Sequence, residues 1–119
     1  MTFELAYDEA GSGRPVVLLH AFPLSRAAFQ AQLGGLADQA RVVAPDLRGF
    51  GESPGPGDDE PTLDLMADDV AALLDRLGID TCILGGLSMG GYVVMSMLRR
   101  HADRVSGVVL IDTKAAADD

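Results

Sequence analysis

The sequence predicts an α/β fold with three layers, in which a mostly parallel sheet lies between helices. Short aliphatic runs alternate along the chain with segments of helical periodicity, an order typical of parallel sheets with right-handed crossovers. These aliphatic runs are residues 16–19, 42–44, 81–84 and 105–111. In such sheets the loops at the carboxyl ends of the strands form the functional site. We therefore look for chemistry in the residues that follow each run.

Length and composition predict one globular domain. The chain has 119 residues, enough to bury about two-thirds of its unfolded surface. Its formal net charge of −9 argues against nucleic acid or an anionic membrane as a partner. The first residues contain no basic region followed by an apolar stretch, so we expect neither a signal peptide nor a membrane span, and a cytoplasmic location is the default. The single cysteine, Cys82, lies in an apolar run and is interpreted as buried packing.

The first half of the chain predicts three strands and one helix. Residues 3–8 alternate apolar and polar side chains, which suits a strand at the edge of the sheet. Residues 16–19 form a continuous apolar run, typical of a strand covered on both faces, and end at His20. Ser25 is then expected to cap a helix whose apolar face includes Phe29 and Leu33. Residues 42–44 form the next strand.

The second half predicts two helices and two strands around a glycine-rich turn. Residues 46–57 contain too many glycines and prolines for regular structure and are expected to form a long loop. Thr62 caps a helix whose apolar residues recur at intervals of three and four, and Gly78 ends it. The run 81–84 leads into that turn, a second helix follows it, and 105–111 is the last strand.

The glycine-rich turn contains the strongest functional signal. Gly86-x-Ser88-x-Gly90 fits the nucleophile-elbow pattern, in which a serine is exposed at a sharp turn between a strand and a helix. Gly86 and Gly90 leave room for the returning helix, and the N–H of Met89 points toward an oxyanion that forms at Ser88. The alternative is a glycine-rich helix cap with Ser88 as an ordinary N-cap residue. A phosphate-binding loop is disfavoured because the Gly-Lys-Ser/Thr ending is absent.

Four landmarks in order carry a resemblance to a known family. They are His20-Ala21-Phe22-Pro23, residues 46–53 (Asp-Leu-Arg-Gly-Phe-Gly-Glu-Ser), residues 86–91 (Gly-Leu-Ser-Met-Gly-Gly) and Leu110-Ile111-Asp112-Thr113. Over its whole length the chain resembles the N-terminal half of an α/β-hydrolase of the esterase and enol-lactonase group. The resemblance implies a truncated α/β-hydrolase fold, spanning residues 1–119, without the cap and last strands.

The resemblance also implies roles for particular residues. Ser88 would be the nucleophile, and the backbone N–H groups of Phe22 and Met89 would form the oxyanion hole. The family usually has glycine where this chain has Ala21, a change that would tighten the oxyanion loop. Family members take their acid and their base histidine from strands beyond those that match this sequence. No cofactor or metal is implied.

The general base is open on the sequence alone. A serine nucleophile needs a base, and the chain contains two histidines. His20 follows a strand near the expected site, and its alternative role is a structural hydrogen bond to loop backbone. His101 lies about 20 Å from Ser88, at the far end of the helix that follows the glycine-rich turn, and this is too far for it to act as the base within one subunit. Asp112 ends the last strand on the same rim and could orient a histidine or cap the strand.

Other charged residues are expected to have structural roles. Asp46 and Arg48 are expected to fix the long loop through a local ion pair, and Asp68 and Asp69 to lie on a solvated helix face. Two functions remain open: an esterase that forms an acyl-serine on small activated esters, and a truncated or designed half-domain without a working triad. Acyl transfer, perhydrolysis or lactone opening would use the same site as the esterase. The apolar run 105–111 would be an exposed edge and predicts a homodimer.

Overall fold

The computed structural model describes residues 5–20, 25, 29–48, 50 and 62–111. Within these ranges the strands are β1 Tyr7–Ala10, β2 Pro15–Leu19, β3 Arg41–Pro45, β4 Cys82–Leu87 and β5 Val105–Ile111. The α-helices are α1 Gln30–Leu36, α2 Leu63–Arg76 and α3 Met89–Arg100, and a 3₁₀ turn, Ala102–Arg104, precedes β5.

The strands form one sheet in the order β1-β3-β2-β4-β5. Strands β2 to β5 are parallel, and β1 runs antiparallel to β3 at one edge. The predicted α/β fold with a mostly parallel sheet is therefore confirmed. In the described residues the edge strand occupies Tyr7–Ala10, where Tyr7 pairs with Pro45 and Ala10 with Val42. Residues 3 and 4 of the predicted strand 3–8 lie outside the described residues.

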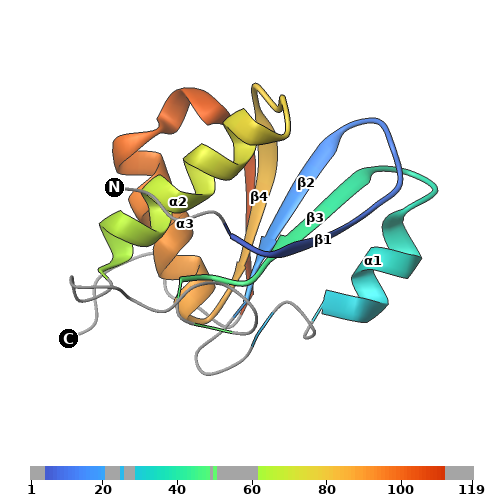
Figure 1. The fold of residues 1–119 in the computed structure, drawn as a ribbon, viewed down its shortest axis with the longest axis horizontal. Coiled ribbons are helices and arrows are strands. Elements are labelled where there is room, and N and C mark those ends of the chain that lie inside the picture. Colours follow the sequence, from blue (N-terminus) through green and yellow to red (C-terminus); the bar gives the residue numbers. More distant parts are fainter. Residues whose placement is uncertain (1–4, 21–24, 26–28, 49, 51–61, 112–119) are drawn as a thin grey trace.

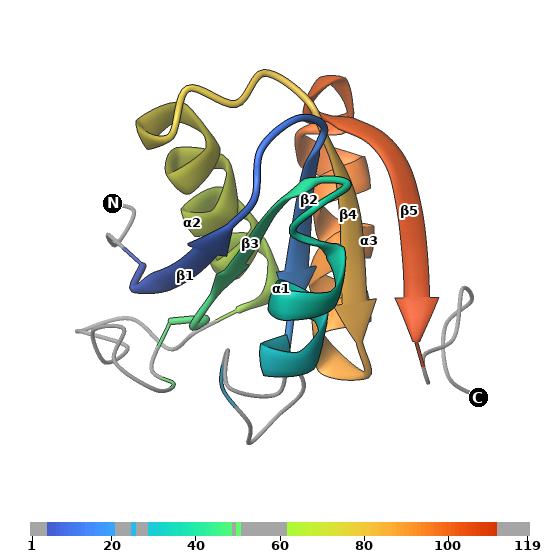
Figure 2. The ribbon, with the colours of Figure 1, turned by 90° about the vertical axis from the view of Figure 1, so that its right-hand side faces the viewer.

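Helices cover both faces of the sheet. Figure 2 shows α1 in front of the strands and α2 with α3 behind them. Alternate side chains of β2 follow this division: Val17 and Leu19 join the core beneath α2 and α3, and Leu18 packs with Phe29 and Leu33 near α1. The apolar run is buried on both sides, as its lack of alternation predicted.

Two helix boundaries follow local signals and one does not. The Thr62 hydroxyl oxygen accepts a hydrogen bond from the Leu65 N–H at 3.1 Å, and Gly78 follows α2 with a φ of 69°. Both were predicted. The described part of the expected helix is α1, which begins at Gln30 with Phe29 as its N-cap, while residues 26–28, which follow the predicted cap at Ser25, lie outside the described residues. The cap makes no side-chain hydrogen bond, and the ring of Phe29 is buried in the smaller core instead.

Ion pairs join the first turns of α2 to the last turn of α3. Asp68 accepts hydrogen bonds from the Arg100 guanidinium, and its Oδ1 lies 2.8 Å from His101 Nε2. Asp64 pairs with Arg99 at 2.8 Å. The prediction that Asp68 lies on a merely solvated helix face is therefore wrong. In the part of the chain that the structure describes, no helix is both long and apolar enough to cross a membrane.

Candidate active site

Ser88 connects β4 to α3 at the carboxyl end of the sheet (Figure 1). Its φ of 54° and ψ of −111° make it the one non-glycine residue with positive φ in the described ranges, and it is exposed. Its N–H donates to the Ile111 carbonyl oxygen at 2.9 Å, and its own carbonyl oxygen accepts from Gly91 N–H at 2.9 Å. Such a conformation stores about 1–3 kcal/mol of strain and is found mainly at functional sites. The turn has the geometry of a nucleophile elbow.

The flanking glycines lie where no side chain fits. A Cβ on Gly86 would lie 2.5 Å from the carbonyl carbon of Gly90 and from Gly91 N. A Cβ on Gly90 would overlap the carbonyl oxygen of Leu19 and lie 2.8 Å from that of His20. The first turn of α3 therefore rests directly on the backbone at the end of β2.

The beginning of α3 provides a partial positive charge next to Ser88. Met89 is the first residue of this 12-residue helix, so the helix ladder does not use its N–H. The helix dipole favours a negative charge at this end. Phe22, the second residue predicted for the oxyanion hole, and Asp112 both lie outside the described residues.

The structure places His20 in the interior. Its side chain is 0 % exposed, and its Nε2 accepts a hydrogen bond from the Leu47 N–H at 2.9 Å. The ring meets that of Phe50 edge-on at 5.4 Å. A ring nitrogen that accepts must be unprotonated, so the proton of neutral His20 is on Nδ1. The hydrogen bond favours the structural role of His20 over that of a base.

His101 lies far from Ser88, at the opposite end of α3. It follows the last residue of the helix and contacts Asp68 on α2. A 12-residue helix is about 18 Å long. The structure thus keeps this histidine away from Ser88 in the same subunit.

A buried ion pair that the sequence interpretation missed joins Arg48, which follows β3, to α2. Arg48 donates from Nε and Nη2 to the two carboxylate oxygens of Asp69, both at 2.7 Å, and the two side chains are 2 % and 1 % exposed. The prediction that Asp69 is solvated is wrong. Arg48, for which a local ion pair within its loop was predicted, binds a carboxylate on α2. The signal was present, because Asp69 falls on the apolar stripe of α2 between Met66 and Leu73.

Cys82 is buried in β4, as predicted. Burial raises the pKa of its thiol to about 11, which leaves almost no thiolate at neutral pH. Among the described residues, no group of histidine, cysteine and acidic side chains could hold a metal ion.

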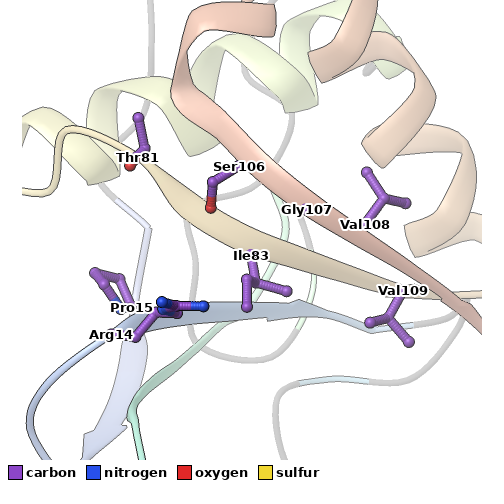
Figure 3. Close-up of a pocket in the computed structure, with 8 residues that line it drawn as sticks. All are labelled: Arg14, Pro15, Thr81, Ile83, Ser106, Gly107, Val108 and Val109. Atoms are coloured by element: carbon purple, nitrogen blue, oxygen red, sulfur yellow. The ribbon is translucent and has the colours of Figure 1, made fainter.

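A cavity of about 680 Å³ lies beside strands β2, β4 and β5 (Figure 3). It is lined by Arg14, Pro15, Thr81, Ile83 and residues 106–109. Arg14 and Thr81 precede β2 and β4, so part of the cavity lies toward the amino ends of the strands. The turn at Ser88 follows the carboxyl end of β4.

The sheet order and the strained serine turn together define an α/β hydrolase. Residues 14–119 match the family model of the alpha/beta hydrolase fold, so the chain belongs to this family.

Several members of the family are similar to this chain. A thermophilic esterase from Thermogutta terrifontis superposes with a TM-score of 0.92 at 47% identity, over 97% of this chain and 42% of that one. The AB hydrolase superfamily protein YisY of Bacillus subtilis is 37% identical over 95% of this chain and 42% of its own length. A soluble epoxide hydrolase from a Corynebacterium species is 38% identical over 92% and 38%. The chain spans less than half the length of each of these relatives.

Proposed function

We propose that this chain carries the nucleophile of a carboxylic ester hydrolase, with Ser88 as the attacking group. The observation that carries the proposal is the strained, exposed conformation of Ser88 where β4 meets α3. The similarity to the Thermogutta terrifontis esterase supports an ester as the substrate. Epoxide hydrolases and haloalkane dehalogenases are also among the relatives, so the family alone does not choose the substrate.

The geometry suits acyl transfer. Ser88 Oγ attacks the carbonyl carbon of the ester, and the oxyanion that forms is stabilised by the N–H of Met89 and the positive end of α3. We assign the second donor to the N–H of Phe22. The bond to the leaving alcohol then breaks, and water releases the acid from the acyl-serine.

The base for this reaction is proposed to come from outside the described part of the chain. Neither histidine is placed to take the proton of Ser88, because His20 Nε2 already accepts from Leu47 and His101 lies at the far end of α3. This observation favours the second candidate function, a half-domain that keeps the fold and the nucleophile turn but not a complete triad. Asp112 keeps its proposed role of orienting a histidine supplied by a longer protein or a second copy.

A serine-directed fluorophosphonate probe tests the proposal. The 119-residue chain should be labelled at Ser88 and should release a burst of p-nitrophenol from a p-nitrophenyl ester. The rate should be low, since an oxyanion hole without a full triad still gives about 10³-fold acceleration over water.

Two variants make the result specific. Ser88→Ala should lose both label and burst, whereas Ser106→Ala, which changes an exposed serine of β5, should keep both. Equal labelling of Ser88→Ala and the unchanged chain would overturn the esterase proposal. A folded chain without any label would favour the incomplete half-domain. We further propose that the substrates are small activated esters and that the protein is located in the cytoplasm.

A further inference from the structure

Contacts among buried residues connect α2 to the turn that carries Ser88. The connection runs from Asp69 to Arg48, from the neighbouring Leu47 to His20, and from the backbone of His20 to Gly90. Each link joins segments that are distant in the sequence.

The first link fixes the loop that follows β3. Arg48 and Asp69 are both nearly inaccessible and share two parallel hydrogen bonds of 2.7 Å. Breaking a buried, two-pronged guanidinium–carboxylate contact is costly, so Arg48 is held in place relative to α2.

The second link carries that position to the end of β2. Leu47 precedes Arg48, and its N–H donates to His20 Nε2 at 2.9 Å. The edge-on contact with Phe50 restrains the ring from the same loop. The side chain of His20 is thus held by Leu47 and Phe50.

The third link reaches the nucleophile. A Cβ on Gly90 would lie 2.7 Å from the Leu19 carbonyl carbon and 2.8 Å from the His20 oxygen. A shift of His20 would therefore press on the first turn of α3. The carbonyl of Ser88, which accepts from the Gly91 N–H, belongs to the same turn.

We propose that His20 is a positioning residue for Ser88, acting through the acceptor at Nε2 rather than as a base. Because the imidazole is bonded to Leu47, the position of the backbone that Gly90 contacts depends on the position of the Arg48–Asp69 pair. Its effect on reaction rate rests on the proposed function, but its effect on the turn does not.

The test compares substitutions that keep or remove the acceptor. In His20→Gln the Oε1 atom can replace Nε2 and accept from Leu47 N–H, whereas His20→Leu fills the site without an acceptor. Leu33→Ala, in the smaller core beside α1, is the control for general loosening of the fold. Amide hydrogen exchange of the ¹⁵N-labelled 119-residue chain is measured by NMR at Leu47, Ser88 and Gly91, and fluorophosphonate labelling gives the reactivity of Ser88.

A positioning role predicts a distinct pattern. His20→Leu should speed exchange at Leu47, Ser88 and Gly91 by about tenfold or more relative to Leu33→Ala, while His20→Gln stays within about threefold of the unchanged chain. Labelling should fall about tenfold or more in His20→Leu and recover in His20→Gln, because small displacements of a reacting group cost large factors in rate.

Other outcomes overturn the inference. Equal loss of labelling in the Gln and Leu variants, with the turn amides still protected, would make His20 a base. Unchanged exchange at Ser88 and Gly91 in His20→Leu would show that the contacts transmit nothing. If His20→Leu does not fold, His20→Asn replaces it, because the shorter amide cannot reach Leu47. If the unchanged chain takes no label, the esterase proposal fails separately, and exchange alone decides the role of His20.

Discussion

Replacing Gly90 with alanine should destabilise the protein and misplace Ser88. The new methyl carbon would overlap the Leu19 carbonyl oxygen and lie 2.7 Å from its carbon. Non-bonded carbon atoms are normally about 3.5–4.0 Å apart, so α3 and β2 would have to separate by about 1 Å. Both sides of the contact are backbone, which cannot change rotamer to relieve it.

The size of the effect follows from that geometry. Overpacking a well-filled site costs about 1–3 kcal/mol, and we expect the upper end because no side chain can yield. Separation would also loosen the packing of Val93, Val94 and Met97, which are 0 % exposed on the buried face of α3. With about 4 °C per kcal/mol for a domain of this size, the melting temperature should fall by about 12 °C.

Thermal unfolding followed by circular dichroism measures this loss. Gly34→Ala in α1 is the matched control, because nothing lies within 4 Å of its added Cβ. That change should stabilise the helix by about 0.5–1 kcal/mol. Labelling of Ser88 should also fall in Gly90→Ala at a temperature where the variant is folded. A Gly90→Ala variant that melts within 2 °C of the unchanged chain would refute the close approach of α3 to β2.

Charged residues of α2 and the exposed strand β5 give three further tests. Asp69→Ala should lower the free energy of unfolding by about 3–5 kcal/mol because it removes the carboxylate that binds the buried Arg48 guanidinium, whereas Asp68→Ala should cost less than about 1 kcal/mol. Urea unfolding that gives similar losses for the two variants would contradict this. The hydrogen bond from Arg100 lowers the pKa of Asp68, so its stabilisation is present above the ordinary value of 3.8 and is lost as the pH falls through the lower folded pKa. Asp68→Asn should flatten that acid limb in urea titrations, and an unchanged limb would count against it. Val109 is 50 % exposed on β5, and we expect this strand to form the contact of a homodimer. Sedimentation should show a dimer that Val109→Lys dissociates. A monomer at micromolar concentration would exclude the homodimer.

Local signals predicted much of the fold. The last strand, 105–111, and the cap at Thr62 were placed correctly, because β-branched runs and capping hydroxyls act over a few residues. The strand before the elbow is longer than predicted and continues to Leu87. Pairing with β2 on one side and β5 on the other keeps Gly85 and Gly86 in the sheet, where propensity alone would place them in the turn.

The candidate site was only partly predictable for the same reason. The nucleophile pattern spans five residues, so the sequence shows it directly. The acceptor role of His20 depends on Leu47, 27 residues away, and the partner of Arg48 is 21 residues away. No local sequence pattern distinguishes a buried histidine that accepts a structural hydrogen bond from one that acts as a general base. Asp69 differs, since its place on the apolar stripe of α2 indicated burial and a charged partner.

The contacts that hold the Ser88 turn determine what its substitution can show. The Ser88 N–H bonds to Ile111 and its carbonyl to Gly91, and the close approaches at Gly86 and Gly90 involve main-chain atoms. These contacts do not use the hydroxyl group. Ser88→Ala therefore keeps these backbone interactions and removes the oxygen that is proposed to attack the ester. Loss of labelling in that variant, with exchange at Gly91 unchanged, would report missing chemistry rather than a collapsed turn.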